Sequence, residues 1–232
     1  MRNNPNLQMV ERMASALGGL RERVVFLGGS AAGLLLTDPA APDLRTTMDV
    51  DVVIEVGTRT GYWKLEKEMR ALGFRPDRRE GAPICRWVIH GMALDLMPSD
   101  AGLLGFGNRW YPGAIRTAWL CCLPGGTRIR VVAPPFFLAT KMEAYQSRGG
   151  GDYLASHDLE DLVAVIDGRP EIVAEVASSE PEVRGYLADV LARFLADPAF
   201  PYALQGHLPP DPGSQKRLPL LLSRMRALAM TK

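Results

Sequence analysis

Two acidic residues interrupt an apolar stretch that otherwise has the composition of a buried strand. Asp49 and Asp51 lie two positions apart within Arg45 to Glu55, RTTMDVDVVIE. Because alternate side chains of a strand point to the same face, these two carboxylates are expected to lie side by side. Like charges at such close range repel each other, and each carboxylate tends to gain a proton unless a cation lies between them. The sequence therefore predicts a cation at this position.

A third acid, Asp95, stands alone among the apolar residues of ALDLMP, where a strand is also expected. Carboxylate oxygens are ligands that Mg²⁺ prefers, and this ion typically bridges one or two carboxylates to substrate phosphates. Asp49, Asp51 and Asp95 are therefore candidate ligands of one or two Mg²⁺ ions, which could orient an attacking hydroxyl in phosphoryl transfer. The alternative is that these aspartates lie on strand faces that are open to water.

A glycine-serine turn precedes the acids along the chain. The run RVVFLGGS joins a short β-rich segment to Gly28, Gly29 and Ser30, and AAGLLL follows. This order predicts a strand, a tight turn and a new helix. The N–H groups at a helix start and the positive end of the helix dipole can hold phosphate oxygens, and the serine hydroxyl adds a donor. Glycine turns before helices also occur for structural reasons alone, which is the alternative here.

The elements that position these residues alternate between helix and strand over residues 1–133. This α/β (α+β) pattern predicts a mixed β-sheet core with flanking helices. A two-residue turn at His90 and Gly91 is expected to join two strands as a hairpin, and residues 37–44 read as a loop. The expected helices cover residues 7–20 and 62–72, and the other expected strands cover 23–27, 48–56 and 127–133.

A change of character after residue 133 predicts a second domain over residues 134–232, a helical C-terminal region. Pro134 and Pro135 suit the first turn of a helix that runs to about Arg148. Gly149, Gly150 and Gly151 then separate it from the rest of the region. Further helices are expected over residues 156–166, 170–177, 180–195 and 216–230, with a proline-rich loop over 197–213.

The composition is that of an ordinary globular protein. The 232 residues are 47% hydrophobic and 23% charged, and the formal net charge is +1, so nothing global requires nucleic acid or a membrane. The start, MRNNPNLQMVERM, lacks the apolar core of a signal peptide, and the longest apolar stretch is too short to span a bilayer. A cytoplasmic protein is expected. The cysteines, Cys85, Cys121 and Cys122, form no CxxC pair and are interpreted as small core residues.

The motifs GGS at residues 28–30, DVD at 49–51 and LDL around Asp95 resemble the signature of the nucleotidyltransferase superfamily with the DNA polymerase β type of catalytic core. The resemblance covers residues 24 to 98. It implies that the turn binds NTP phosphates and that the three acids bind Mg²⁺, with Asp95 as a metal ligand or as the base for the acceptor. A nucleoside monophosphate would move from the NTP to a hydroxyl, and pyrophosphate would leave. Eighteen residues separate Ser30 from Asp49, a longer gap than is usual in the family.

A second resemblance lies in KMEAYQSR and HDLEDL, which contain Lys141, Arg148, Asp158 and Asp161. These segments are similar to a motif of abortive-infection nucleotidyltransferase toxins. The resemblance implies that Lys141 contacts the triphosphate, that Arg148 shares in nucleotide binding, and that Asp158 supports the catalytic lysine or the acceptor. The residues alone also permit surface ion pairs and helix first-turn acids that have no function.

Together the resemblances imply a Mg²⁺-dependent nucleotidyltransferase of the toxin type, with an NTP as substrate, tRNA as acceptor and a cognate antitoxin as partner. Two alternatives remain, because fold and metal site do not choose the acceptor. One is modification of a small molecule such as an antibiotic, and the other is nucleotide binding without catalysis. A cluster of arginines, Arg75, Arg78, Arg79 and Arg86, is interpreted as a solvated basic face rather than an RNA contact.

Overall fold

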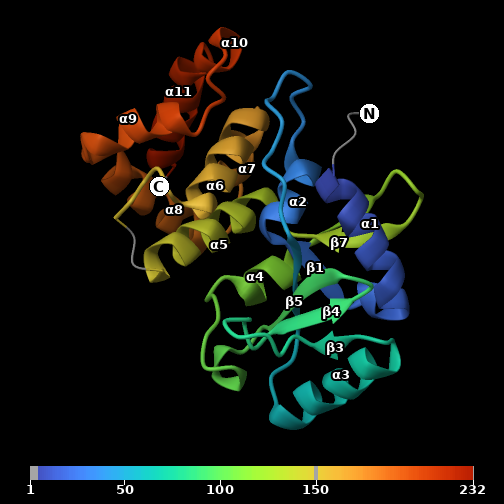
Figure 1. Ribbon diagram of the computed structural model, residues 1–232. Coiled ribbons are helices and arrows are strands. Elements are labelled where there is room, and N and C mark those ends of the chain that lie inside the picture. The colour runs from blue at the N-terminus through green and yellow to red at the C-terminus, as the bar shows by residue number, and fades with distance from the viewer. Residues whose placement is uncertain (1–4, 149–150, 232) are drawn as a thin grey trace. The chain divides into compact units, whose positions relative to one another are not determined.

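The computed structural model describes residues 5–148 and 151–231, in two compact units (Figure 1). The first unit contains the residues up to Leu34 and Arg45–Ala133. The second contains Leu35–Leu44 and the residues from Pro134 onward. The segment 35–44 therefore leaves the first unit and returns to it, which the predicted division at residue 133 did not anticipate. Gly149 and Gly150, two of the glycines expected to separate helices, lie outside the described residues, as do the first four residues.

Within the described residues, the first unit contains a seven-stranded mixed sheet, which confirms the predicted fold class. Its strand order is β3-β4-β5-β2-β1-β7-β6. The pairs β2–β5 and β1–β7 are parallel, and the other neighbours are antiparallel. The strands are β1 (Val24–Leu27), β2 (Asp49–Ile54), β3 (Arg75–Pro76), β4 (Arg86–Ile89), β5 (Met92–Pro98), β6 (Trp119–Cys122) and β7 (Arg128–Val131).

The predicted hairpin between β4 and β5 is confirmed, and its turn has the expected chemistry. His90 has φ of 48° and Gly91 has φ of 76°. Positive φ at both central residues is typical of the type I′ turn, whose twist matches that of the flanking strands. The turn fixes the register in which Arg86 lies opposite Asp95.

The helix α3 of the first unit begins and ends where its sequence provides caps. The helix α3 (Arg59–Ala71) starts at Thr58, whose hydroxyl accepts a hydrogen bond from the Gly61 N–H at 3.1 Å, and Gly73 follows its end with φ of 90°. The remaining helical elements are α1 (Pro5–Leu17), α2 (Gly28–Leu35), α4 (Tyr111–Arg116) and the 3₁₀ helices η1 (Gly18–Glu22) and η2 (Ala101–Leu103).

The second unit is helical, as predicted, and is built around α5 (Pro134–Ser147). Most residues of α5 are buried on all sides of the helix, including Phe136, Phe137 and Leu138, so it is the central helix of this unit. The helices α6 (His157–Gly168) and α8 (Pro181–Ala196) pack against it. The other helices of this unit are α7 (Ile172–Ala177), α9 (Ala199–Gly206), α10 (Pro212–Gln215) and α11 (Leu218–Ala229).

Several local expectations were wrong. The segment 197–213, expected to be a loop, contains α9 and the start of α10, because its prolines fall before or within first turns, where a missing N–H is tolerated. Cys122 is exposed and Cys121 is half-buried on the edge strand β6, whereas Cys85 is buried as expected. Among the described residues, no helix is long and apolar enough to cross a membrane.

Candidate active site

Polar residues form one row across the middle of the sheet in the first unit. Arg86 on β4 lies opposite Asp95 on β5, and Asp95 lies opposite Asp51 on β2. Asp51 is in turn opposite Leu27, the last residue of β1. Since directly opposed residues project to the same face, the register brings the predicted acids together on adjacent strands.

Arg86 is a cation that two of the three predicted acids, Asp49 and Asp95, share. Its Nε donates to Asp95 Oδ1 at 2.7 Å, and its Nη2 donates to Asp95 Oδ2 at 2.7 Å and to Asp49 Oδ2 at 2.5 Å. The fork of the guanidinium thus binds Asp95 with two nitrogens and shares one of them with Asp49. The interpretation of Arg86 as part of a solvated basic face was therefore wrong, because its strand position turns it toward the acids.

The acids change the protonation equilibria of their neighbours. Hydrogen bonding to Asp95 raises the pKa of Arg86 above its already high ordinary value, with Asp49 and Asp51 adding to the effect, so this cation stays charged. Burial raises the pKa of the adjacent Cys85 thiol to about 12, and the charges of Asp95 and Asp51 add to the effect. Cys85 is therefore a protonated, unreactive thiol at neutral pH.

Gly28 brings the predicted phosphate-binding turn against the acids. A Cβ atom at this position would lie 1.9 Å from Asp51 Oδ2, and Gly28 has φ of 71°. Only glycine fits such a conformation and such an approach without strain. The long gap between Ser30 and Asp49 does not separate the two motifs, because the extra residues 35–44 belong to the helical unit.

The helix α2 starts at this turn, so Gly28, Gly29 and Ser30 are its first residues. The first N–H groups of a helix have no partner within the helix and can hold an anion. Ser30 is 2% exposed, and its hydroxyl has no hydrogen-bond partner among the described residues. A buried hydroxyl without a partner is a costly feature in a folded protein and marks a position that a ligand can satisfy.

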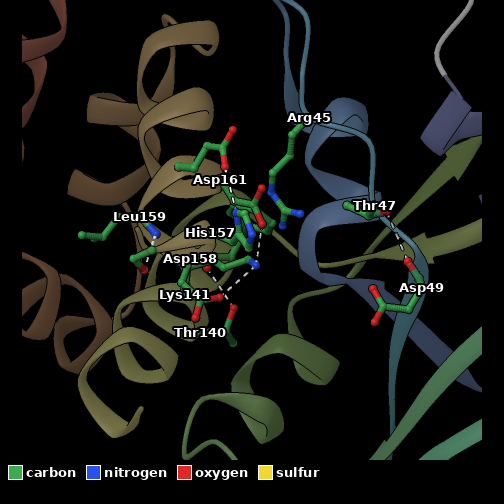
Figure 2. Close-up of polar contacts among 12 residues, drawn as sticks. Arg45, Thr47, Asp49, Thr140, Lys141, His157, Asp158, Leu159 and Asp161 are labelled. Atoms are coloured by element: carbon green, nitrogen blue, oxygen red, sulfur yellow. Dashed lines mark hydrogen bonds and ion pairs between the residues drawn. The ribbon is translucent and has the colours of Figure 1, made fainter. Parts of the chain in front are cut away.

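Asn6 on α1 holds the segment that leads into β2. Its side chain is 2% exposed, donates to the Arg45 carbonyl at 2.8 Å and accepts from the Thr47 N–H at 3.0 Å. Thr47 Oγ1 in turn contacts the carbonyl of Asp49 at 3.3 Å, as Figure 2 shows. These bonds fix the backbone immediately before the acids. Asn6 was not predicted as a site residue, because a single polar residue within an apolar helix face is a weak sequence signal.

The acids suit Mg²⁺ in chemistry but not in their present arrangement. Among the described residues, no three acidic, histidine or cysteine side chains form a group that could hold a metal ion. Arg86 Nη2 touches both Asp49 and Asp95, and so takes the position that a shared cation would occupy. The donor set fits Mg²⁺ only when the guanidinium has left.

A second charged cluster lies within the helical unit. Lys141 on α5 contacts two aspartates of α6, with Nζ 3.2 Å from Asp158 Oδ1 and 2.6 Å from Asp161 Oδ2 (Figure 2). Arg148 Nη1 lies 2.8 Å from Asp158 Oδ2. Lys141 is 9% exposed, so the alternative of an ordinary surface ion pair was wrong for this residue. The structure thus joins four residues that the sequence motif had grouped.

Local sequence explains how the second cluster forms. Ser156 caps α6, and its hydroxyl accepts from the Leu159 N–H at 3.3 Å. The cap fixes the first turn, and the spacing of three between Asp158 and Asp161 then places both on the side of α6 that meets Lys141.

The comparisons with known proteins show the fold. No protein-family model matches the chain, and no curated protein matches it in sequence. The crystal structure of an antigenic nucleotidyltransferase-like protein from Paracoccidioides brasiliensis is similar, with a TM-score of 0.50 and 20% sequence identity. The match covers 87% of this chain and 92% of that chain. The chain has a nucleotidyltransferase-like fold. The similarity to abortive-infection toxins stays a prediction.

Proposed function

We propose that the chain is a cytoplasmic nucleotidyltransferase that moves a nucleoside monophosphate from an NTP to an acceptor hydroxyl. The observation that supports this most directly is the contact between the α2 start and the acidic row. There Gly28 lies against Asp51 at a helix end whose N–H groups can hold an anion, and the buried Ser30 hydroxyl has no partner among the described residues. A phosphate group would bind the N–H groups at the start of α2, and its Mg²⁺ would bind the neighbouring carboxylates. An anion alone would leave the carboxylates unbound, and a cation alone would leave the N–H groups unbound.

In the proposed reaction, the acceptor oxygen attacks the α-phosphorus of the NTP. The bond from that phosphorus to the bridging oxygen breaks, pyrophosphate leaves, and the acceptor proton passes to Asp95 or to water. Gly28, Gly29 and Ser30 would bind phosphate oxygens, and Asp49, Asp51 and Asp95 would hold Mg²⁺ once Arg86 has moved away. Bound Mg²⁺ would neutralise charge on the phosphates.

The acceptor in this proposal is the 3′ end of tRNA, and the protein is a toxin that a cognate antitoxin neutralises. This part rests on the motif around Lys141 and Asp158. Contact of Lys141 and Arg148 with the triphosphate, and support of Lys141 by Asp158, remain predictions. The buried pairing of Lys141 with two carboxylates agrees with a lysine that is held in one orientation.

A second candidate is nucleotide binding without catalysis. The specific observation in its favour is Arg86, which fills the position between Asp49 and Asp95. In this case the protein would bind NTP at the α2 start and release no pyrophosphate.

The test is transfer of label from each of the four NTPs, labelled at the α-phosphate, to bulk tRNA in the presence of Mg²⁺. We expect labelled tRNA with the unaltered protein, a loss of more than a hundredfold with Asp49→Asn, and no change with Glu80→Gln, an exposed acid of the same unit. Full activity of Asp49→Asn would contradict the mechanism. The second candidate would be favoured if the protein binds nucleotide but releases no pyrophosphate when either tRNA or a small-molecule acceptor is supplied.

A further inference from the structure

Arg86 does more than balance charge, because its contacts are to candidate metal ligands. Its guanidinium binds two of the three acids that are predicted to hold the metal, through Asp49 Oδ2 and both carboxylate oxygens of Asp95. The two oxygens that share Nη2, Asp49 Oδ2 and Asp95 Oδ2, are gathered around one atom. A cation that replaces that nitrogen would find both oxygens already in place.

The cluster is also open enough for one cation to replace another. The side chains of Asp49, Arg86 and Asp95 are 31%, 21% and 11% exposed. Water therefore reaches Asp49 and Arg86, whereas Asp95 is buried, and this access lowers the cost of moving the guanidinium away from Asp49. A guanidinium is also weakly hydrated, and its fork matches phosphate oxygens as well as carboxylates.

We propose that Arg86 is a displaceable counter-ion, which excludes free divalent metal from Asp49 and Asp95 and moves to the phosphates when the metal arrives with a nucleotide. The proposal rests on the proposed function and adds a positioning residue to it. Free Mg²⁺ must compete with a guanidinium that holds both acids. A nucleotide carrying Mg²⁺ brings the metal and also offers Arg86 new anionic partners, so only the complete substrate makes the exchange favourable.

The proposal predicts opposite changes in two affinities when Arg86 is removed. Arg86→Gln should bind free metal more tightly, because the competitor is gone, and should bind nucleotide more weakly, because a phosphate donor is gone. A purely structural role of Arg86 would weaken both affinities or change neither. The two readouts therefore separate positioning from folding.

The experiment measures Mn²⁺ binding to the nucleotide-free protein by electron paramagnetic resonance, and binding of α,β-methylene ATP and GTP analogues by calorimetry. We expect Arg86→Gln to bind Mn²⁺ at least tenfold more tightly than the unaltered protein and to bind the tighter analogue at least threefold more weakly. The double variant Arg86→Gln with Asp49→Asn should lose the gain in Mn²⁺ affinity. The control Arg78→Gln removes an exposed arginine from the preceding loop and should change neither affinity.

Unchanged or weaker Mn²⁺ binding by Arg86→Gln would overturn the proposal. If this variant unfolds in metal-free buffer, millimolar Mn²⁺ should restore a cooperative thermal transition, and failure to restore it would also count against the proposal. Arg86→Lys, which keeps the charge but loses the fork, should give an intermediate Mn²⁺ affinity. These measurements need no acceptor, so they can succeed even where transfer to tRNA fails.

Discussion

In each of the two charged clusters, one cation contacts two carboxylates, but the two clusters differ in their exposure to water. In the first unit one guanidinium, Arg86, joins Asp49 and Asp95, and in the helical unit one ammonium, Lys141, joins Asp158 and Asp161. The side chains of the Lys141 group are 11%, 7% and 4% exposed, less than those of the Arg86 group. Arg148, whose side chain is 73% exposed, adds a second cation to Asp158 at the edge of the Lys141 cluster.

The two clusters differ in how readily they can change partners. Buried ions such as Lys141, Asp158 and Asp161 are costly to separate, because each would be left uncompensated in a poorly hydrated site. Ions that water reaches, with two carboxylates for one cation, can accept a further cation. We therefore expect the Lys141 cluster to hold its geometry and the Arg86 cluster to exchange ions.

The largest effect is expected from breaking the buried cluster. Lys141→Met keeps the volume of the side chain but leaves Asp158 and Asp161 without their shared cation. Unfolding by urea should show a loss of about 3–5 kcal/mol. Arg86→Gln should cost only about 1–2 kcal/mol in the same measurement, because its site is partly hydrated. The control is Lys64→Met at an exposed position of α3, and equal costs for Lys141→Met and Arg86→Gln would break the comparison.

A smaller effect is expected from Gly28→Ala, which adds one methyl group beside the acids. The new Cβ would overlap Asp51, and positive φ in a residue other than glycine costs about 1–2 kcal/mol. We expect thermal unfolding at lower temperature, together with loss of nucleotide binding by calorimetry. Gly19→Ala is the matched control, since no heavy atom lies within 4 Å of its added Cβ. Normal nucleotide binding by Gly28→Ala would show that Asp51 is not part of the site.

The smallest effect concerns Cys85, which reports on the charge of the first cluster. Its pKa of about 12, raised from 9.0 chiefly by burial, keeps the thiol protonated in the folded protein while the unfolded chain already ionises. Stability should therefore fall as the pH rises from about 9 toward 12. At pH 9, iodoacetamide should modify Cys122 at once and Cys85 only after unfolding, as mass spectrometry of digested protein would reveal. Asp95→Asn should lower the pKa of Cys85 modestly, and no decrease would mean that burial alone sets its value.

The sequence predicted the elements of the first unit best where local chemistry decides the structure. The hairpin at His90 and Gly91 and the strand before Gly28 follow from short-range patterns, and the mixed sheet follows from their alternation. The elements β3 and β6 were missed, because β3 has only two residues and the edge strand β6, WLCC, shows no alternation of apolar and polar residues. The helix α9 was predicted as a loop because of its prolines, although proline is tolerated in the first turn of a helix.

The sequence predicted the acids of the candidate site but not Arg86, the cation that binds two of them. Asp49, Asp51 and Asp95 stand out as charges within apolar strands, and their common face follows from the register. Arg86 was grouped with Arg75, Arg78 and Arg79 by its nearness in sequence. The hairpin register could have predicted this contact, because a two-residue turn at 90–91 places residue 86 opposite residue 95.

The segment 35–44 ties the helical unit to the site-bearing strands by more than one crossing of the chain. Its backbone and side chains are held by that unit, where Arg217 binds Asp38 and Arg169 binds the Leu35 carbonyl. Yet it lies in sequence between Ser30 and Asp49, the two motifs of the first unit. Appending residues from 134 onward to an ancestral sheet domain would not by itself have produced this arrangement. Expression of residues 1–133 alone would leave residues 35–44 without Arg169 and Arg217, which hold them in the whole chain.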